Sequence, residues 1–455
     1  MSRTHYLLLD DRIIESVENA RLNLGKATKH EANPLFSEDQ PWEMRFDNLY
    51  ANVIYDHEEE LFKCWYSPFI VDYSAKDMGL DERRSTPYRA PSNREMGLCY
   101  ATSQDGLTWE KPALNLVEYA GSSTNNILWR GSGNTRASKA GPHGAGIMKD
   151  LSEPNPRRRY KAILKSGVLS VAFSPDGIHW DAARQCPEAD SAGDTHNNAF
   201  WAPTLGKYVG ITRQWSEDFQ RQIARTSSED FLNWQKVEIV LEGTTHRHQT
   251  YAMPAFYYGG IYLGLLSVHD QDTDRVQLEL TWSPDAVTWK RVCPGTPLIP
   301  NGVAEGDYDW GCIYAAAVPI IRENEILIYY GGSDGLHTSW RTGYFCLATL
   351  GADRFVGYES IDKLGVATIT TAEMFDATST LALTADIYKG GNLVAEIIDE
   401  KQNVLYRSQL FSQSVTNEKV NWSNVAAASN TYEETYRLRF KFKQGCIYTI
   451  KKGAS

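Results

Sequence analysis

The sequence predicts an all-β chain, a five-bladed β-propeller followed by a C-terminal β-sandwich, and three observations support this prediction. A short Ser-x-Asp-x-x-x-Trp pattern recurs four times before residue 290. Runs of β-branched and aromatic residues alternate with turn-rich segments along the whole chain, and long amphipathic helical patterns are almost absent. With 455 residues, the chain is also longer than one ordinary single-core domain, which favours a repeat architecture with a second unit.

The recurring pattern occupies residues 103–109, 174–180, 228–234 and 283–289. Its Asp and Gly residues are typical of a tight turn, and its Trp can pack back onto a sheet. A strand-like run precedes each copy, at 96–102, 168–173 and 276–282 among others. We therefore expect the four copies at equivalent outer turns of successive blades.

Further pairs of strand-like runs complete the blades, and they lie at residues 50–55 and 61–66, 251–257 and 260–267, and 315–321 and 325–330. A run at 342–350 closes the region. Five such groups fall within residues 42–360. Closing the sheets into a ring protects the edge strands, so we expect a propeller there.

The pattern changes after about residue 362. Six short strand-like runs follow at 366–371, 380–388, 393–399, 405–411, 436–442 and 446–451. Short strands separated by turns predict a β-sandwich over residues 365–455. Residues 1–41 have no clear pattern, and we expect an N-terminal extension that packs on the propeller.

Composition narrows the function classes. The net charge is −11 and no long Lys/Arg-rich run is present, which argues against a nucleic-acid partner. The seven cysteines are scattered and form no CxxC pair, so neither a disulfide framework nor a thiolate zinc site is expected. The apolar run near the N-terminus is too short for a signal peptide or a membrane span, so we expect a cytoplasmic chain with no membrane partner. The oligomeric state stays open.

Three segments carry a family resemblance: the Ser-to-Trp turns, the closing segment GYFCLATLGADRFVGY at 343–358, and the strands NLVAEIIDEKQNVL at 392–405 and YRLRFKFKQGCIYTI at 436–450. In these segments the chain resembles the five-bladed-propeller glycoside hydrolases, among them invertases, levanases, arabinanases and xylosidases. The resemblance covers nearly the whole chain. It implies an exo-acting glycosidase with an oligosaccharide substrate and acidic residues in a central funnel.

Candidate site residues are the polar and aromatic residues near the start of each predicted inner strand, because those strands line the channel of a propeller. From the first blade to the fifth and its following loop, the candidates are Trp42, Asp47, His143, Asp194, His196, Trp201, His246, Arg247, His248, Glu305, Asp309, Trp310, His337 and Arg341. The tryptophans are candidates for stacking on sugar rings.

Cleaving a glycosidic bond requires one group that protonates the leaving oxygen and a second that attacks or activates water. The resembled families carry an Asp on the first blade, an Asp on the third and a Glu on the fourth. Asp47 and Asp194 match the first two positions, whereas the fourth blade has histidines and no inward Glu unless Glu242 takes that place. We rank His248 first as the proton donor, since acidic neighbours would keep an imidazole protonated, with Glu305 second and Asp309 as a further candidate.

Two other functions remain open. A glycoside phosphorylase would need a cationic pocket, which His246, Arg247, His248 and Arg341 could form, and the same pocket could bind a sulfated or uronic sugar. A non-catalytic carbohydrate-binding propeller would also lack the fourth-blade Glu. No cofactor is expected. Because histidines fall one to a blade, a structural cation in the channel stays open as well.

Overall fold

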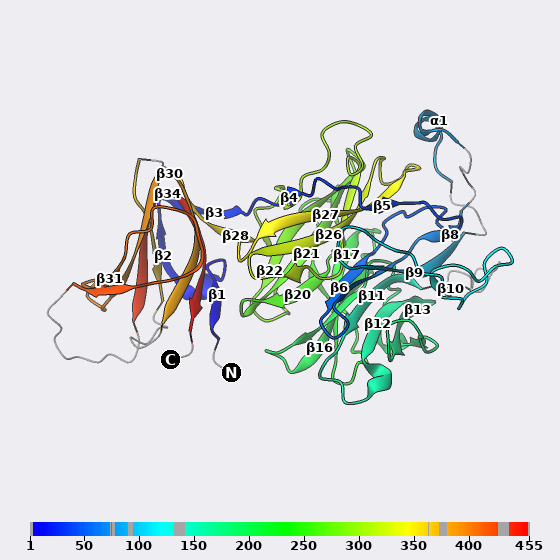
Figure 1. Ribbon diagram of the computed structural model, residues 1–455, viewed down its shortest axis with the longest axis horizontal. Coiled ribbons are helices and arrows are strands. Elements are labelled where there is room, and N and C mark those ends of the chain that lie inside the picture. Colours follow the sequence, from blue (N-terminus) through cyan, green and yellow to red (C-terminus); the bar gives the residue numbers. More distant parts are fainter. Residues whose placement is uncertain are drawn as a thin grey trace.

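The computed structural model describes residues 3–72, 74, 78–89, 94–131, 142–362, 364–372, 380–425 and 436–453. Their regular secondary structure is almost entirely β-strand, with one short helix, α1 (Leu80–Ser85), and a few single 3₁₀ turns. The all-β prediction is confirmed. Figure 1 shows two bodies side by side, a larger one that carries β6 to β27 and a smaller one that carries β1, β2, β30, β31 and β34. No helix among the described residues is long and apolar enough to cross a membrane.

The larger body begins with three antiparallel sheets whose strands follow chain order. The first sheet contains β6 (Asn52–Asp56), β7 (Leu61–Tyr66), β9 (Glu95–Ser103) and β10 (Ile127–Arg130), with β8 (Phe69–Val71) beside β9. The second contains β11 (His143–Lys149), β12 (Tyr160–Ser166), β13 (Val168–Ser174) and β14 (Arg184–Gln185). The third contains β15 (Asn198–Ala202), β16 (Lys207–Trp215), β17 (Arg221–Ser228) and β18 (Glu238–Leu241).

Two further groups of strands form one larger sheet. The fourth group contains β19 (His248–Ala252), β20 (Ala255–Tyr258), β21 (Ile261–Asp270), β22 (Arg275–Ser283) and β23 (Lys290–Val292). The fifth contains β24 (Cys312–Ala315), β25 (Ile320–Ile321), β26 (Glu325–Ser333) and β27 (Gly343–Gly351), with β4 (Thr28–Lys29) and β5 (Phe36–Ser37) beside β27. A parallel pairing of Val276 with Cys312 joins the two groups.

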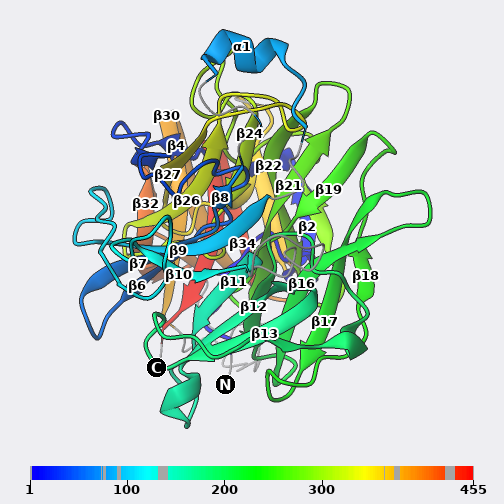
Figure 2. The same cartoon turned by 90° about the vertical axis from the view of Figure 1, so that its right-hand side faces the viewer.

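The first strands of neighbouring groups contact each other near a common centre. Asn52 Nδ2 in the first sheet donates to the carbonyl oxygen of Ala145 in the second (2.7 Å). Strand β15 contacts both β11 and β20. The amide of Ala317, between β24 and β25, donates to the carbonyl oxygen of Ala51 (2.9 Å), so the fifth group returns to the first. Figure 2 shows the groups following one another around this centre.

The four Ser-to-Trp turns directly follow one strand in each of the first four groups, namely β9, β13, β17 and β22. In the second sheet, the Ser174 hydroxyl donates to Asp176 (3.0 Å), whose carboxylate accepts from the backbone amides of Ile178 and His179 (2.8 Å each). The corresponding serine and aspartate in the other three copies make the same contacts. Gly177 has a φ of +79°, which a glycine adopts without strain.

The smaller body is one antiparallel sheet of ten strands. It contains β28 (Val356–Ser360), β29 (Ala367–Thr371), β30 (Leu381–Ile398), β31 (Val404–Ser408), β32 (Val415–Lys419), β33 (Trp422–Asn424) and β34 (Arg437–Lys452), together with β1 (His5–Leu7), β2 (Ile14–Glu18) and β3 (Ala20–Leu24). The N-terminal segment therefore contacts both bodies, because β4 and β5 lie along β27.

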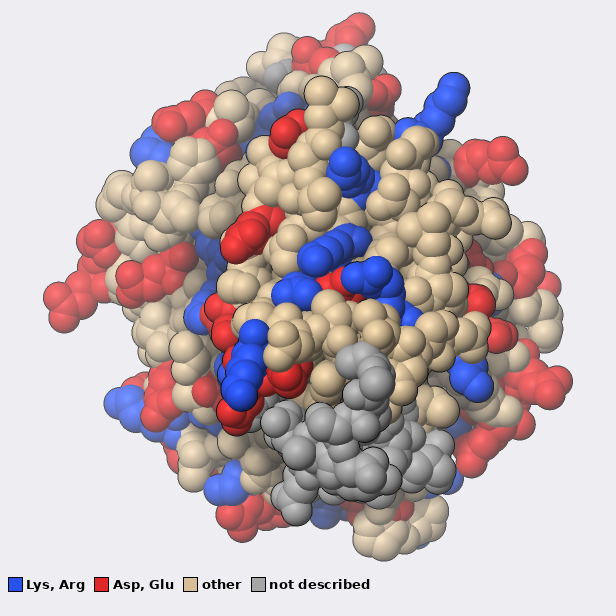
Figure 3. Space-filling model, turned by 90° about the vertical axis from the view of Figure 1, so that its left-hand side faces the viewer, with Lys and Arg blue, Asp and Glu red and all other residues tan. Residues whose placement is uncertain are grey.

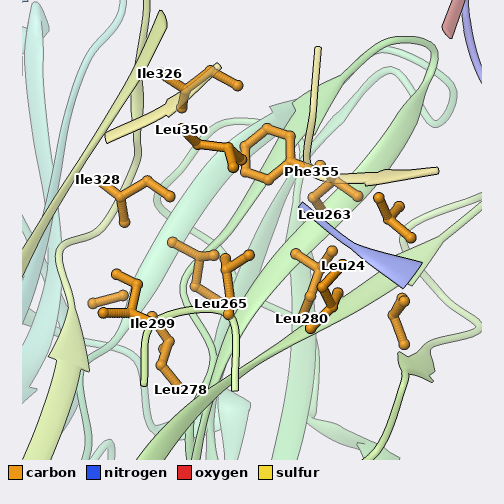
Figure 4. Packing of buried hydrophobic residues seen from close by; sticks show 14 of the residues in the cluster. Leu24, Leu263, Leu265, Leu278, Leu280, Ile299, Ile326, Ile328, Leu350 and Phe355 are labelled. Carbon is orange, nitrogen blue, oxygen red and sulfur yellow. The ribbon is translucent and has the colours of Figure 1, made fainter. Parts of the chain in front are cut away.

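Separate apolar cores stabilise the two bodies. Figure 4 shows part of the core of the fourth and fifth groups, where Leu263, Leu280 and Ile328 pack with Leu24, the last residue of β3, and Phe355, the residue before β28. The smaller body has its own buried cluster. On its outward face, Lys and Arg side chains gather near the middle (Figure 3).

Candidate functional site

Side chains from all five groups meet where the inner strands begin. We call the following residues the axial cluster: Asp47, Asn48, Tyr50, His143, Asp194, His196, Arg213, Arg221, Tyr251, Tyr314, His337 and Arg341. Hydrogen bonds, ring contacts or ion pairs connect each of them to its neighbours. The segment that leads into β6 is tightly turned, with positive φ at Asp47, Leu49 and Tyr50.

Asp47 lies between two buried guanidinium groups. Its Oδ1 accepts from Arg45 Nη2 (2.6 Å) and Arg341 Nη2 (2.7 Å). Arg341 also donates to Asn48 Oδ1 (2.7 Å). Burial alone would raise the pKa of Asp47, but the charges of Arg45 and Arg341 outweigh it, and the pKa lies below its usual value. Asp47 is therefore a fixed carboxylate at neutral pH.

Asp194 is the more accessible of the two predicted carboxylates, with 41% of its side chain exposed. It accepts from Lys165 Nζ (3.0 Å) and lies 3.4 Å from His143 Nε2. Burial opposes ionisation, but the charges of His143, Lys165 and Arg213 hold the pKa of Asp194 well below its usual range. Burial also lowers the pKa of His143 to about 4, despite the pull of Asp194 and Asp47. At neutral pH this part of the site therefore contains two carboxylates and a neutral imidazole.

Phenol groups occupy the centre of the cluster. Asn48 Nδ2 donates to the hydroxyl oxygens of Tyr50 (2.7 Å) and Tyr251 (3.0 Å), and the Tyr314 hydroxyl contacts His337 Nδ1 (2.9 Å). Burial raises the pKa of Tyr50 and of Tyr314 well above the usual value. These phenols keep their protons and can donate hydrogen bonds to a ligand.

His196 lies deeper, packed on the ring of Tyr50 with 5.2 Å between centroids. It is 1% exposed, and burial lowers its pKa to about 3. Burial likewise lowers the pKa of His337 well below its usual value. The imidazoles of the cluster are therefore neutral, in contrast to the protonated histidine that an acidic funnel would hold.

Two arginines from neighbouring strands complete the cluster. Arg213, 3% exposed, donates to the carbonyl oxygen of Tyr251 from Nε and Nη2 (3.2 and 2.7 Å). Arg221 donates from Nη1 to Gln249 Oε1 (2.9 Å). Both guanidinium groups lie over the ring of Tyr251, at 4.3 and 5.1 Å from its centroid. Within the described part of the chain, neither arginine has a carboxylate at ion-pair distance.

The fourth-group candidates lie outside the axial cluster. His246 and Arg247 are exposed, and Arg247 is paired with Asp272 (2.8 Å). The His248 side chain is 41% exposed, and its Nε2 lies 3.7 Å from Asp270. The predicted cationic pocket of these residues with Arg341 does not appear in the structure, since Arg341 is bound to Asp47 instead.

The fifth-group candidates before β24 are also elsewhere. Asp309 is 1% exposed and forms an ion pair with Lys29 Nζ (2.6 Å), which attaches the N-terminal segment to this group. The guanidinium carbon of Arg275 lies 4.9 Å from the ring centroid of Trp310. Glu305 is exposed in the same loop. Asp309 therefore has a structural partner, whereas Glu305 is accessible.

The remaining aromatic candidates have separate positions. Trp42 Nε1 donates to Asn126 Oδ1 (2.7 Å) inside the first sheet, and Trp201 is 45% exposed and packs edge-on against Tyr208. The described residues contain no group of three or more His, Cys, Asp or Glu side chains that could hold a metal ion.

Sequence reasoning did not select Lys165, Arg213 or Arg221. The strand register explains how they reach the cluster: Lys165 lies opposite His143, and Arg221 lies opposite Trp215, two residues beyond Arg213. The sequence contained a signal for Arg213 and Arg221. Each of these arginines interrupts a strand-like run, one before and one after the short connection between β16 and β17.

No family model and no curated protein matches the chain. Solved structures to which the chain is similar include a glycosyl hydrolase from Bacteroides ovatus (15% identity, 71% of this chain and 94% of that chain, TM-score 0.49). They also include an N-acetylgalactosamine deacetylase from F. plautii (12%, 73% and 96%, 0.48) and a β-1,2-mannobiose phosphorylase from Listeria innocua (14%, 71% and 96%, 0.47). These identities and TM-scores are low, and they do not assign a function to this chain.

Proposed function

We propose that this chain cleaves glycosidic bonds at the axial cluster, as an exo-acting glycosidase on oligosaccharides. The five groups of strands are then the blades of a β-propeller over residues 42–360, preceded by the extension 1–41 and followed by a β-sandwich over 365–455. The observation that carries the proposal is the pair of ionised aspartates, Asp47 and Asp194, which come from different groups and both act electrostatically on His143.

The two carboxylates have different surroundings, which suggests different roles. Asp194 is partly exposed and can reach a ligand, so we assign it the attack on the anomeric carbon or the activation of water. Asp47 is held between Arg45 and Arg341, so we assign it to stabilising the positive charge that develops on the sugar ring. The phenols and Asn48 are suitable hydrogen-bond partners for sugar hydroxyls.

We propose that the proton donor comes from outside the axial cluster, because the buried imidazoles of the cluster are neutral and both of its aspartates are ionised. His248 stays first, since it starts β19 and its partly exposed imidazole lies near the carboxylate of Asp270. Glu305 stays second, since it is accessible on the neighbouring group.

A glycoside phosphorylase is the second candidate. The observation that favours it is the unpaired charge of Arg213 and Arg221, since phosphorolysis needs a cationic site for phosphate. Cleavage that depends on added phosphate would favour this candidate over hydrolysis.

The test is a broad oligosaccharide panel with detection of new reducing ends, applied to the unaltered chain and to Asp47→Asn and Asp194→Asn. We expect cleavage by the unaltered chain and a loss of about 100-fold or more in each variant, typical of removing a positioned acid or base. Asp150→Asn is the control, because Asp150 is ion-paired with Lys161 (3.1 Å) outside the axial cluster. Binding of a glycan without turnover would indicate a non-catalytic carbohydrate-binding protein instead.

A further inference from the structure

Arg213, which is buried, and Arg221, which is half-buried with a buried Nε, have no carboxylate at ion-pair distance among the described residues. Other arginines with enclosed side chains have carboxylate partners: Arg341 pairs with Asp47, and Arg291 with Glu279 (2.6 Å). Arg213 and Arg221 instead use neutral acceptors, a carbonyl and an amide oxygen. Because an unpaired buried charge is unfavourable, such a site is expected to have a compensating anion when it functions.

The strand register places the two guanidinium groups on one face. Arg213 in β16 and Arg221 in β17 are diagonal neighbours across the antiparallel pair, since Trp215 lies opposite Arg221. Both lie over the Tyr251 ring and beside Trp215, at 5.6 and 4.9 Å from its centroid. The two side chains therefore face the same small region between the third and fourth groups.

Each of the two guanidinium groups has hydrogen-bond donors that no described residue accepts from. Within the described residues, Nη1 of Arg213 and Nη2 of Arg221 make no hydrogen bond, and Nε of Arg221 is buried without a partner. Burial and the charge of Arg213 lower the pKa of Arg221, which indicates that the two cations repel each other. An anion between them would relieve the repulsion and accept these donors.

Electrostatics favours an anion over a neutral sugar hydroxyl here. The chain as a whole carries a net charge of −11, yet at this point the positive charges have no carboxylate counterpart. Planar guanidinium groups bind carboxylate, sulfate and phosphate through paired N–H donors. Asp194 interacts electrostatically with Arg213, but it is already engaged by Lys165.

We propose that Arg213 and Arg221 form an oxyanion subsite next to Asp194. The oxyanion is either a substituent of the sugar, such as a uronic carboxylate or a sulfate, or a free inorganic phosphate. The proposal rests on the proposed function in taking a sugar as the ligand. It does not depend on cleavage.

The experiment measures binding to the full chain by calorimetry at constant ionic strength, with glucuronate, glucose, inorganic sulfate and inorganic phosphate as probes. We expect at least one oxyanion to bind and Arg221→Gln to weaken it by about tenfold or more, the effect of losing hydrogen bonds between charged groups. Arg225→Gln is the matched control on β17, because Arg225 lies 3.8 Å from its own carboxylate partner, Glu238. Arg213→Lys, which keeps the charge, accompanies Arg213→Gln in case the latter does not fold.

The arms of the experiment separate the outcomes. Tighter binding of glucuronate than of glucose and phosphate identifies a substituent of the sugar, and tighter binding of phosphate identifies a free oxyanion. The proposal is overturned if no oxyanion binds, or if Arg221→Gln and Arg213→Gln bind as the unaltered chain does. Oxyanion binding in a chain that cleaves no glycan would reject the proposed glycosidase and leave the subsite standing.

Discussion

Replacing Asp194 with Asn separates catalysis from stability most clearly. The substitution keeps the shape of the side chain and removes its charge. Asp194 lies on the loop before β15, its side chain is 41% exposed, and its ionic contacts are Lys165 at 3.0 Å and His143 at 3.4 Å. Because the carboxylate is partly solvated, its ion pair with Lys165 should contribute less than about 1 kcal/mol to the free energy of unfolding.

The expected effect on rate is much larger. Removing a positioned base or nucleophile reduces the rate by about 100-fold or more, and two decades correspond to about 2.7 kcal/mol of transition-state free energy. The pKa of Asp194 lies well below its usual range, so the carboxylate stays ionised above about pH 4. In the unaltered chain, kcat/KM should therefore show no loss of activity from protonation of Asp194 between about pH 4 and pH 7.

The assay combines initial rates on the best substrate of the panel, from pH 4 to pH 8, with urea denaturation of the same preparations. We expect a large fall in kcat/KM at every pH and nearly unchanged unfolding. Turnover close to that of the unaltered chain would remove Asp194 from the mechanism. A loss of stability as large as the loss of transition-state stabilisation would show that the carboxylate is structural.

Three further predictions follow from particular contacts. Removing the true proton donor should abolish cleavage of natural linkages but spare an aryl glycoside with a good leaving group. The rates of His248→Ala and Glu305→Gln on both substrates therefore identify the donor. If neither variant loses activity on natural linkages, neither residue is the donor. Asp309→Asn leaves Lys29 unpaired and should lower the free energy of unfolding by about 3 kcal/mol with kcat/KM unchanged. Denaturation and rate assays measure the two effects. A loss of rate without a loss of stability would restore Asp309 as a candidate catalytic residue. The pKa of Asp176 is lowered to about 2, so the stabilisation from its carboxylate is present above about pH 4 and is lost as the pH falls towards 2. Denaturation at several pH values should therefore show that Asp176→Asn loses less free energy of unfolding in acid than the unaltered chain. An identical pH dependence in the two chains would contradict this.

The local features of the fold could be predicted because they depend on neighbours in the sequence. In each Ser-to-Trp turn the aspartate accepts from amides two and three residues ahead, so the pattern alone specifies the contacts. These local contacts place Asp176 and its counterparts in turns that follow a strand. The path of the N-terminal segment could not be predicted, because β1 and β4 pair with β34 and β27, which lie hundreds of residues away in the chain.

The candidate site was predictable only in part. Asp47 and Asp194 were selected from their positions before strands, and both reach the axial cluster. His248 and Asp309 were selected by the same rule, but His248 is partly exposed outside the axial cluster and Asp309 is bound to Lys29. A position before a strand does not specify which way the side chain points, since that depends on loop backbone and on partners from other groups.

The sequence by itself determined the strand content, the repeated turns and the choice of Asp47 and Asp194 as candidate site residues, because strand periodicity and turn chemistry act over a few residues. The tertiary structure decided the electrostatics of the site. Arg45 and Arg341 surround Asp47, and Arg213 and Arg221 bring unpaired positive charge beside Asp194, although the chain has an excess of acidic residues. Local charge and pKa depend on burial and on partners brought together by folding, and neither can be read from net composition or from spacing along the chain.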